Sequence, residues 1–185
     1  MGFHHVALAT ADMPATHAFY TEAMGFTLAK VQAAPTPEGG WAKHLFYDTG
    51  SAGMIAFWEL HDETMPEVDG AMSRAVGLPE WVNHMAFHAV DDDHYESSRE
   101  RWLSLGADVM EIDHGFVRSI YTMDPNGTMV EWCQDLRVLD ESDHAEAISL
   151  LNDPEPELTV PPEPVFHRGD RSVTPPWKSP APAGQ

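Results

Sequence analysis

Short stretches in which apolar and polar side chains alternate recur along the first 135 residues, and two stretches of helical character interrupt them. A period of two is typical of a strand with one buried face. Helices are predicted at residues 14–24, after the capping residue Asp12, and at 92–105; each ends at a glycine. Strands are predicted at residues 3–10, from 26 to the turn at 35–40, and at 42–48, 53–60, 82–90, 107–112, 116–123 and 128–133.

The order strand, helix and three strands therefore occurs twice, which is the mark of an internal repeat. The segment FHHVALATADM aligns with VNHMAFHAVDD, so that His5 matches His84 and Asp12 matches Asp91. We predict an α+β fold with two βαβββ modules within residues 1–135. Module one covers residues 1–60, an acidic connection with a possible short helix covers 61–81, and module two covers 82–135.

The composition changes after residue 135. A helix is predicted at residues 142–151, and nine of the 15 prolines lie beyond it. A segment so rich in proline is not expected to form a sheet. We expect residues 136–185 to form this helix and an extended arm packed on its own or a partner subunit, with Val165, Phe166 and Trp177 as anchors. The alternative is a frayed end.

Acidic residues outnumber basic ones by 30 to 10, for a formal net charge of −20. Such a charge repels phosphate backbones and anionic lipid surfaces, so neither nucleic acid nor membrane is an expected partner. Cys133 is the single cysteine, which excludes a disulfide within the chain. With neither a signal peptide nor an apolar membrane span in the sequence, we expect a cytoplasmic protein.

Three residues on separate apolar strands are the candidate metal ligands. His5 and His84 are related by the repeat, and Glu131 lies in the last strand, within DPNGTMVEW. A carboxylate in such a strand is costly to bury unless it is paired or binds a metal. Two histidines and one carboxylate make a facial site for a divalent metal with open positions. Each residue taken alone has a structural explanation; the three together predict a metal site.

Five further residues are candidates for the surroundings of this site. Aligning Gly53 with Gly127 places Phe57 where a symmetric fourth ligand would stand, and a phenyl ring cannot bind a metal. Glu59 faces the same way and becomes a fourth ligand if the register shifts. His44 and His88 are candidates for proton transfer or for contacts around the ligands, or else are merely packed. Tyr121 is either a catalytic hydroxyl or a core tyrosine.

The sequence resembles the vicinal oxygen chelate superfamily, which includes glyoxalase I, bleomycin-resistance proteins, fosfomycin-resistance transferases and type I extradiol dioxygenases. The resemblance covers about residues 3–134, and SIYTMDPNGTMVEW is its most specific motif; the other matching segments are HHVAL, AFYTEAMGF and NHMAFHAVDD. It implies a curved mixed sheet around a metal that chelates substrate oxygens. It also implies that His5, His84 and Glu131 are the ligands and that Tyr121 is catalytic.

The sequence also departs from that pattern. Gly53 stands where ring-cleaving dioxygenases have a catalytic histidine, and Phe57 stands where glyoxalase I has its fourth ligand. The leading hypothesis is an Fe(II) extradiol-type dioxygenase that acts on a small aromatic or vicinal-oxygen substrate. The alternatives are a glyoxalase-like lyase, isomerase or epimerase, and a resistance-type protein that binds a small molecule without turnover. Mn(II), Ni(II), Co(II) and Zn(II) remain possible metals, and a homodimer is expected.

Overall fold

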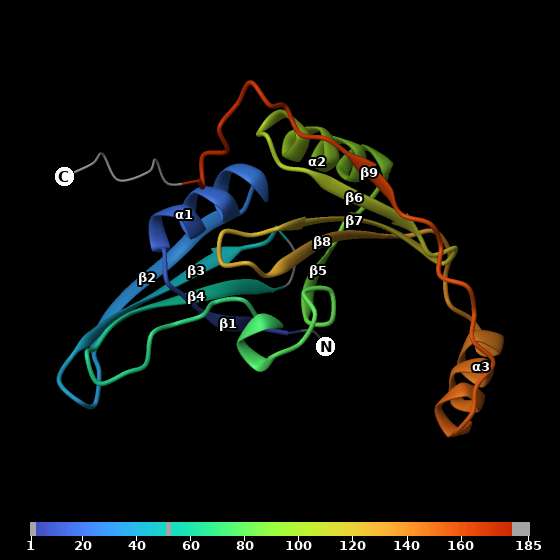
Figure 1. The fold of residues 1–185 in the computed structure, drawn as a ribbon, viewed down its shortest axis with the longest axis horizontal. Coiled ribbons are helices and arrows are strands. Elements are labelled where there is room, and N and C mark those ends of the chain that lie inside the picture. The colour runs from blue at the N-terminus through green and yellow to red at the C-terminus, as the bar shows by residue number, and fades with distance from the viewer. Residues whose placement is uncertain (1–2, 51–52, 179–185) are drawn as a thin grey trace.

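The computed structural model describes residues 3–50 and 53–178 and arranges the strands in two mixed sheets (Figure 1). The first sheet has the order β1-β4-β3-β2, and it consists of β1 (His5–Thr10), β2 (Thr27–Pro35), β3 (Trp41–Asp48) and β4 (Met54–His61). The second has the order β5-β8-β7-β6-β9, and it consists of β5 (His84–His88), β6 (Val109–Asp113), β7 (Val117–Met123), β8 (Met129–Asp135) and β9 (Val165–His167). The predicted α+β fold with two βαβββ modules is confirmed.

The repeated aspartates begin the two module helices. Asp12 caps α1 (Met13–Ala18), where its side chain accepts a hydrogen bond from the Ala15 amide at 2.9 Å. Asp91 caps α2 (Asp92–Ser104) in the same way, through the amide of His94 at 2.8 Å. A cap of this kind contributes about 1 kcal/mol to stability, because it satisfies an amide that has no partner within the helix. The repeat thus preserves the start of each helix as well as the strand pattern.

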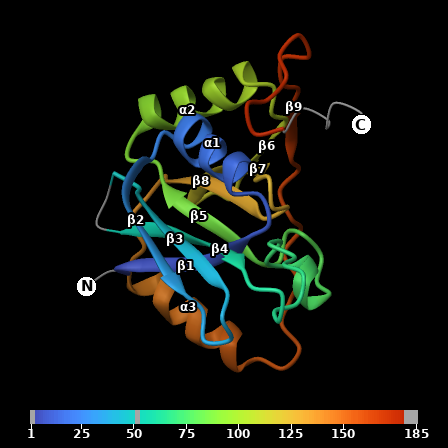
Figure 2. The ribbon, with the colours of Figure 1, turned by 90° about the vertical axis from the view of Figure 1, so that its left-hand side faces the viewer.

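The two module helices, α1 and α2, cover one side of the sheets (Figures 1 and 2), and the two modules share a core of buried residues. The helix α1 continues into a π-helical turn, η1 (Phe19–Ala23), whose Tyr20 ring lies 4.6 Å from that of Phe57 on β4. From module two, the buried indole of Trp102 donates a hydrogen bond to the carbonyl oxygen of Ala23 at 3.1 Å. Trp102 therefore ties α2 to the end of η1 in the other module.

The connection between the modules contains one helical turn, the 3-10 helix η2 (Arg74–Val76). The last helix, α3 (Glu141–Asn152), stands apart from the sheets in Figure 1, and none of its residues, all of which are described, is buried. Within residues 3–50 and 53–178 no helix is long and apolar enough to cross a membrane.

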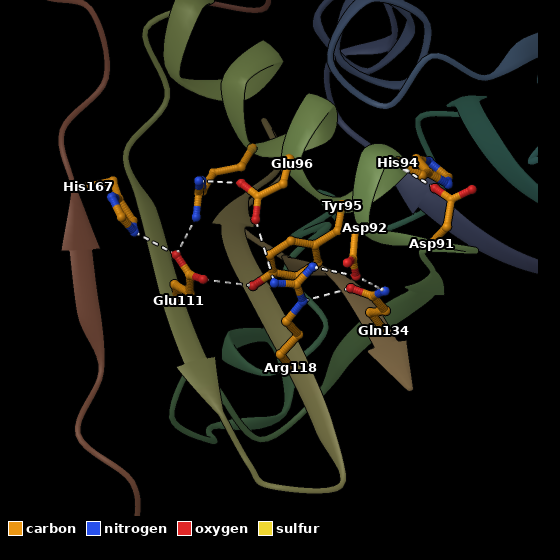
Figure 3. Close-up of polar contacts among 10 residues, drawn as sticks. Asp91, Asp92, His94, Tyr95, Glu96, Glu111, Arg118, Gln134 and His167 are labelled. Atoms are coloured by element: carbon orange, nitrogen blue, oxygen red, sulfur yellow. Dashed lines mark hydrogen bonds and ion pairs between the residues drawn. The ribbon is translucent and has the colours of Figure 1, made fainter. Parts of the chain in front are cut away.

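The Pro-rich arm does form a strand, and the expectation that it cannot was wrong. β9 pairs antiparallel with β6, where Val109 faces His167 in the register. Proline is tolerated beside an edge strand, and here Pro164 precedes the first residue of β9. The arm is also held by side chains: the Nε2 atom of His167 lies 2.7 Å from a carboxylate oxygen of Glu111, within the polar cluster of Figure 3. Farther along, the buried Trp177 ring packs 5.1 Å from Phe19.

Candidate metal centre

His84 and Glu131 meet on neighbouring parallel strands of the second sheet. In the register of β5 and β8, His84 lies opposite Met129 and Ala86 lies opposite Glu131, so both polar side chains are on one face. The Nε2 atom of His84 is 3.1 Å from Oε2 of Glu131. Only 6% of the Glu131 side chain is exposed, against 36% for His84. The carboxylate is therefore held in the sheet, and the imidazole covers it from the solvent side.

The second nitrogen of His84 fixes the orientation of the ring. Nδ1 lies 3.1 Å from the carbonyl oxygen of Trp81, which can only accept a hydrogen bond, so Nδ1 carries the proton. Nε2 is therefore the atom that faces the Glu131 carboxylate. A proton on Nε2 makes this contact an ion pair, and a metal ion can take the place of that proton between the two atoms.

The pair meets the requirements of a divalent metal. Two ligands about 2.1 Å from one metal and at right angles to each other are about 3.0 Å apart, close to the separation found here. A hydrogen bond from the remote nitrogen of a ligand histidine to a backbone carbonyl is the usual support for such a ligand. The residues present therefore fit a metal, with one nitrogen and one oxygen donor supplied from the second module.

Tyr121 lies beside this pair, directly opposite Glu131 in the register of β7 and β8. Its ring stands edge-on to that of His84, with centroids 6.2 Å apart. Burial, and to a smaller extent the Glu131 charge, raise the pKa of Tyr121 to about 12, so its hydroxyl stays protonated at neutral pH. The side chain can therefore donate a hydrogen bond or a proton next to the carboxylate.

His114 is a residue of this region that the sequence reasoning missed. Its Nε2 atom lies 3.1 Å from the Tyr121 hydroxyl oxygen. It belongs to the tight turn between β6 and β7, where Gly115 adopts a positive φ of 82°. Neither the internal repeat nor the strand alternation marks a turn histidine. Only the folded hairpin shows that it reaches the tyrosine.

His5, the third predicted ligand, lies on the other sheet. Its ring contacts residues of its own module: Phe46 with centroids 5.3 Å apart, and His44 with centroids 6.2 Å apart. Among the described residues, no three histidine, cysteine, aspartate or glutamate side chains are grouped as a metal site requires. One copy of the chain thus brings together His84 and Glu131, and it leaves His5 apart from them.

Phe57 is not the counterpart of Glu131. Ala7 faces Ala56 in the register of β1 and β4, just as Ala86 faces Glu131 in the second module, so Ala56 holds the equivalent position. Phe57 points to the opposite side of the sheet, where it is 1% exposed and packs on Tyr20. The placement of Phe57 at the site was therefore wrong by one residue. Its ring belongs to the core.

The other candidates lie in three different settings. Glu59 lies two residues after Phe57 on β4, so its side chain is on the same face of the sheet as that of Phe57. It forms ion pairs with Lys43 at 3.0 Å and with His61 at 3.1 Å. His88 is on the face of His84, but it is exposed and lies 3.6 Å from Asp135. His44 is buried on the face of the first sheet that carries His5.

The comparisons with known proteins agree with this architecture. No curated protein matches the chain. A fosfomycin resistance protein, FosX, from Listeria monocytogenes has 20% identity and a TM-score of 0.51, over 72% of this chain and 93% of its own. A glyoxylase/bleomycin resistance protein/dioxygenase domain from Frankia sp. EAN1pec has 18% identity and a TM-score of 0.51, over 73% of this chain and 98% of its own. At these identities the likeness shows the fold alone.

The family model covers most of the chain. The model of the Glyoxalase/Bleomycin resistance protein/Dioxygenase superfamily matches residues 2–132, which span both modules and end one residue after Glu131. The arm and α3 lie outside the match. The chain therefore belongs to the glyoxalase, bleomycin resistance and dioxygenase superfamily, the one that the sequence motifs resemble.

Proposed function

We propose that the protein is a metal-dependent enzyme, an Fe(II) extradiol-type dioxygenase of small aromatic or vicinal-oxygen substrates, and that two copies of the chain share each metal site. In this proposal His84 and Glu131 come from one copy and His5 comes from the other. The observation that carries the proposal is the approach of His84 Nε2 to Glu131 Oε2, 3.1 Å apart, which is the separation of two ligands on one divalent metal. Two histidines and one carboxylate are the donor set of non-haem Fe(II) oxygenases.

The position of His5 supports a shared site. It is exposed at the start of β1, an edge strand of the first sheet, while the His84 and Glu131 pair lies on the second sheet. A twofold dimer repeats every contact, so a first module that covers the partner's second module forms two identical sites. The dimer predicted from the sequence then has a chemical reason, because each copy completes the ligand set of the other.

The residues around the pair would each perform one task. The metal, when bound, supplies open positions for two substrate oxygens and dioxygen and favours ionisation of a bound hydroxyl. The Trp81 carbonyl oxygen holds His84 in the tautomer whose Nε2 is free to bind. Tyr121 keeps its proton and can donate it from Oη to a substrate oxygen, while His114 fixes the direction of that hydroxyl.

Metal analysis of protein purified without oxygen tests this proposal, followed by oxygen-uptake assays with a panel of catechols. We expect about one iron per chain and oxygen uptake with at least one catechol. Glu131→Gln should lose both properties while it remains folded by circular dichroism. His88→Gln, which changes an exposed histidine on β5, the strand that carries His84, is the control and should keep both.

Two results would reject parts of this proposal. Zinc, nickel or manganese without oxygen uptake would remove the dioxygenase assignment and favour a lyase or isomerase. Metal contents that are equal in wild type and Glu131→Gln would remove the metal site itself and leave a binding protein without turnover.

A further inference from the structure

Arg101, on α2, differs from every other arginine of the chain in its contacts. The others each form an ion pair with an aspartate or a glutamate; they are Arg74, Arg99, Arg118, Arg137, Arg168 and Arg171. Arg101 is half-buried, and its guanidinium forms neither an ion pair nor a hydrogen bond with any residue of 3–50 or 53–178. Because the chain has 30 acidic and 10 basic residues, carboxylates are not in short supply. The guanidinium is therefore free to bind an anion from solution.

The Arg101 guanidinium lies in a cavity between the two modules. The volume of this cavity is about 290 Å³. Module one lines it with residues 24–27 and with the turn that follows β3, and module two lines it with His94, Arg101 and Trp132. A methyl group on Gly25 would lie 2.6 Å from Nη1 of Arg101, so the glycine leaves room for the guanidinium. Arg101 thus reaches from the helix of module two to the start of β2 in module one.

His94 supplies a second hydrogen-bond donor to the same cavity. It lies seven residues before Arg101, which places the two side chains on one face of α2. Its Nδ1 atom accepts a hydrogen bond from the Val90 amide at 3.4 Å, so the neutral ring carries its proton on Nε2. Burial, with smaller contributions from Arg101 and His88, lowers the pKa of His94, although Asp91 opposes the shift. The ring is therefore neutral at pH 7 and can donate from Nε2.

The charges around the cavity favour an anion with a single charge. Among the described lining residues the one carboxylate is that of Asp48. Asp48 is exposed, and its Oδ1 atom accepts a hydrogen bond from the Gly50 amide at 2.9 Å. A guanidinium binds a carboxylate through two parallel hydrogen bonds. One guanidinium with an acidic residue nearby therefore suits a carboxylate better than a phosphate dianion.

A second cavity adjoins the first and is mainly apolar. Its volume is about 340 Å³, and the two cavities share Thr49, Gly50, His94 and Trp132. Apolar side chains from both modules form most of its walls; they are Phe3, Val6, Met54, Ala86, Phe87 and Val90. Phe3 is 82% exposed and Val90 is 66% exposed, so apolar surface is open to solvent beside the guanidinium. Exposed apolar surface of this kind marks binding sites.

We propose that the two cavities together bind a small carboxylate with an apolar tail, of the kind found in medium-chain fatty acids. The carboxylate pairs with Arg101 and His94, and the tail lies in the apolar cavity. The anionic head is separate from the metal pair, because Trp132 follows Glu131 on β8 and faces the opposite side of the sheet. This inference does not depend on the proposed function. Since both modules line the site, the ligand also bridges them.

Binding of octanoate to the full chain, measured by isothermal titration calorimetry, tests this inference. Arg101→Gln should weaken octanoate binding by about 10-fold or more, because the carboxylate loses its charged partner. Lys30→Gln removes the same charge from an exposed residue of β2, and this control should change the affinity by less than about 2-fold. The neutral probe 1-octanol has the same tail, and its affinity should be equal in wild type and Arg101→Gln. Circular dichroism verifies that both variants are folded.

The same titration in Glu131→Gln separates this site from the proposed metal centre, since a carboxylate can also bind a metal. Octanoate should bind Glu131→Gln as tightly as wild type, whether or not the wild-type protein holds a metal. Loss of binding in Glu131→Gln but not in Arg101→Gln would overturn the inference and place the carboxylate at the metal pair. Equal octanoate affinities of Arg101→Gln and Lys30→Gln would also overturn it, as would failure of the wild type to bind octanoate at millimolar concentrations.

Discussion

Ala56 occupies in the first module the position that Glu131 occupies in the second. Each lies on the last strand of its module, directly opposite the alanine that follows the module's histidine by two residues. The sequence alignment missed this because it matched Gly53 with Gly127. In the structure, the left-handed glycine of the first turn is Gly50, with φ of 79°, and that of the second is Gly127, with φ of 83°. Gly53 and Gly127, which the alignment matched, therefore have different backbone conformations. The residue equivalent to Glu131 is Ala56, one residue before the position that the alignment gave.

Ala56→Glu should therefore create a second carboxylate in the geometry of Glu131. Ala56 is fully buried, so without metal the substitution should lower the free energy of unfolding by about 2 kcal/mol, because it buries a charge without a partner. Addition of Co(II) should recover this loss. Thermal unfolding with and without Co(II) measures the effect.

Ala56→Gln is the control for that experiment. It has nearly the same size but no charge, and it should be destabilised without recovery by Co(II). If Co(II) stabilises both variants equally, Ala56 does not face a metal site.

Mixing two inactive variants tests whether the site is shared. His5→Ala and Glu131→Ala should each lack turnover. After unfolding and refolding together at equal amounts, mixed dimers should contain one intact site of two, so total activity should recover to about a quarter of wild type.

A site formed within one chain predicts the opposite outcome. Every chain in the mixture then lacks one ligand, and activity stays at the level of the separate variants. The single variants refolded alone serve as the baseline, and their sedimentation shows whether dimers form.

Tyr121→Phe should lower kcat by roughly 100-fold at unchanged metal content, since it removes a proton donor but no ligand. His114→Phe should lower kcat by about 10-fold, because the tyrosine hydroxyl loses the partner that directs it, 3.1 Å away. In both variants KM should change little. Steady-state kinetics with elemental analysis distinguishes these results from loss of metal, which would place either residue among the ligands or their supports.

Much of the fold was predictable because it repeats. The capping aspartates Asp12 and Asp91 and the strand alternation are local signals, and in the structure α1 and α2 begin directly after these two residues. His84 and Glu131 were both predicted as ligands on apolar strands, and in the structure their strands are neighbours with both side chains on one face. The separation of His5 from this pair could not be predicted in this way, because alternation shows which face of a strand a residue occupies and not which sheet lies opposite that face.

The remaining differences arose from long-range contacts. β9 is three residues long and follows Pro164, and its hydrogen bonds depend on the open edge of β6 rather than on its own composition. The contact of His114 with Tyr121 likewise depends on how one hairpin closes. Pattern reasoning has no access to such contacts, since the interacting residues carry no periodic signal.

The arm should loosen in acid because carboxylates hold it. Oδ2 of Asp108 accepts a hydrogen bond from Nη2 of Arg171 at 2.7 Å, and Oδ1 accepts one from the Gly169 amide at 2.9 Å. The hydrogen bond from Arg171, and to a smaller extent that from the Gly169 amide, lowers the pKa of Asp108 from 3.8 to about 2. Since the folded-state pKa is the lower one, this anchor contributes fully above about pH 4 and is lost as the pH falls towards 2.

Glu111 is a second carboxylate that holds the arm less well in acid, through its contact with His167. Burial would raise the pKa of Glu111, but the contacts with His167 and Arg99 outweigh it and lower the pKa below 4.5. Amide hydrogen exchange of Val165–His167, corrected for the intrinsic rate, should therefore be about 10-fold faster at pH 2.5 than at pH 6. Asp108→Asn should show fast exchange already at pH 6.

Asp143→Asn provides the matched control for the arm. The Arg137 side chain lowers the pKa of Asp143 to about 2 as well, but this pair lies at α3, whereas β9 pairs with β6. Its loss should leave the exchange of Val165–His167 unchanged at pH 6, whereas a general effect of removing an acidic charge would accelerate exchange in both variants. Equal protection of β9 in wild type and Asp108→Asn at pH 6 would show that the β6 and β9 backbone bonds hold the arm without the carboxylate.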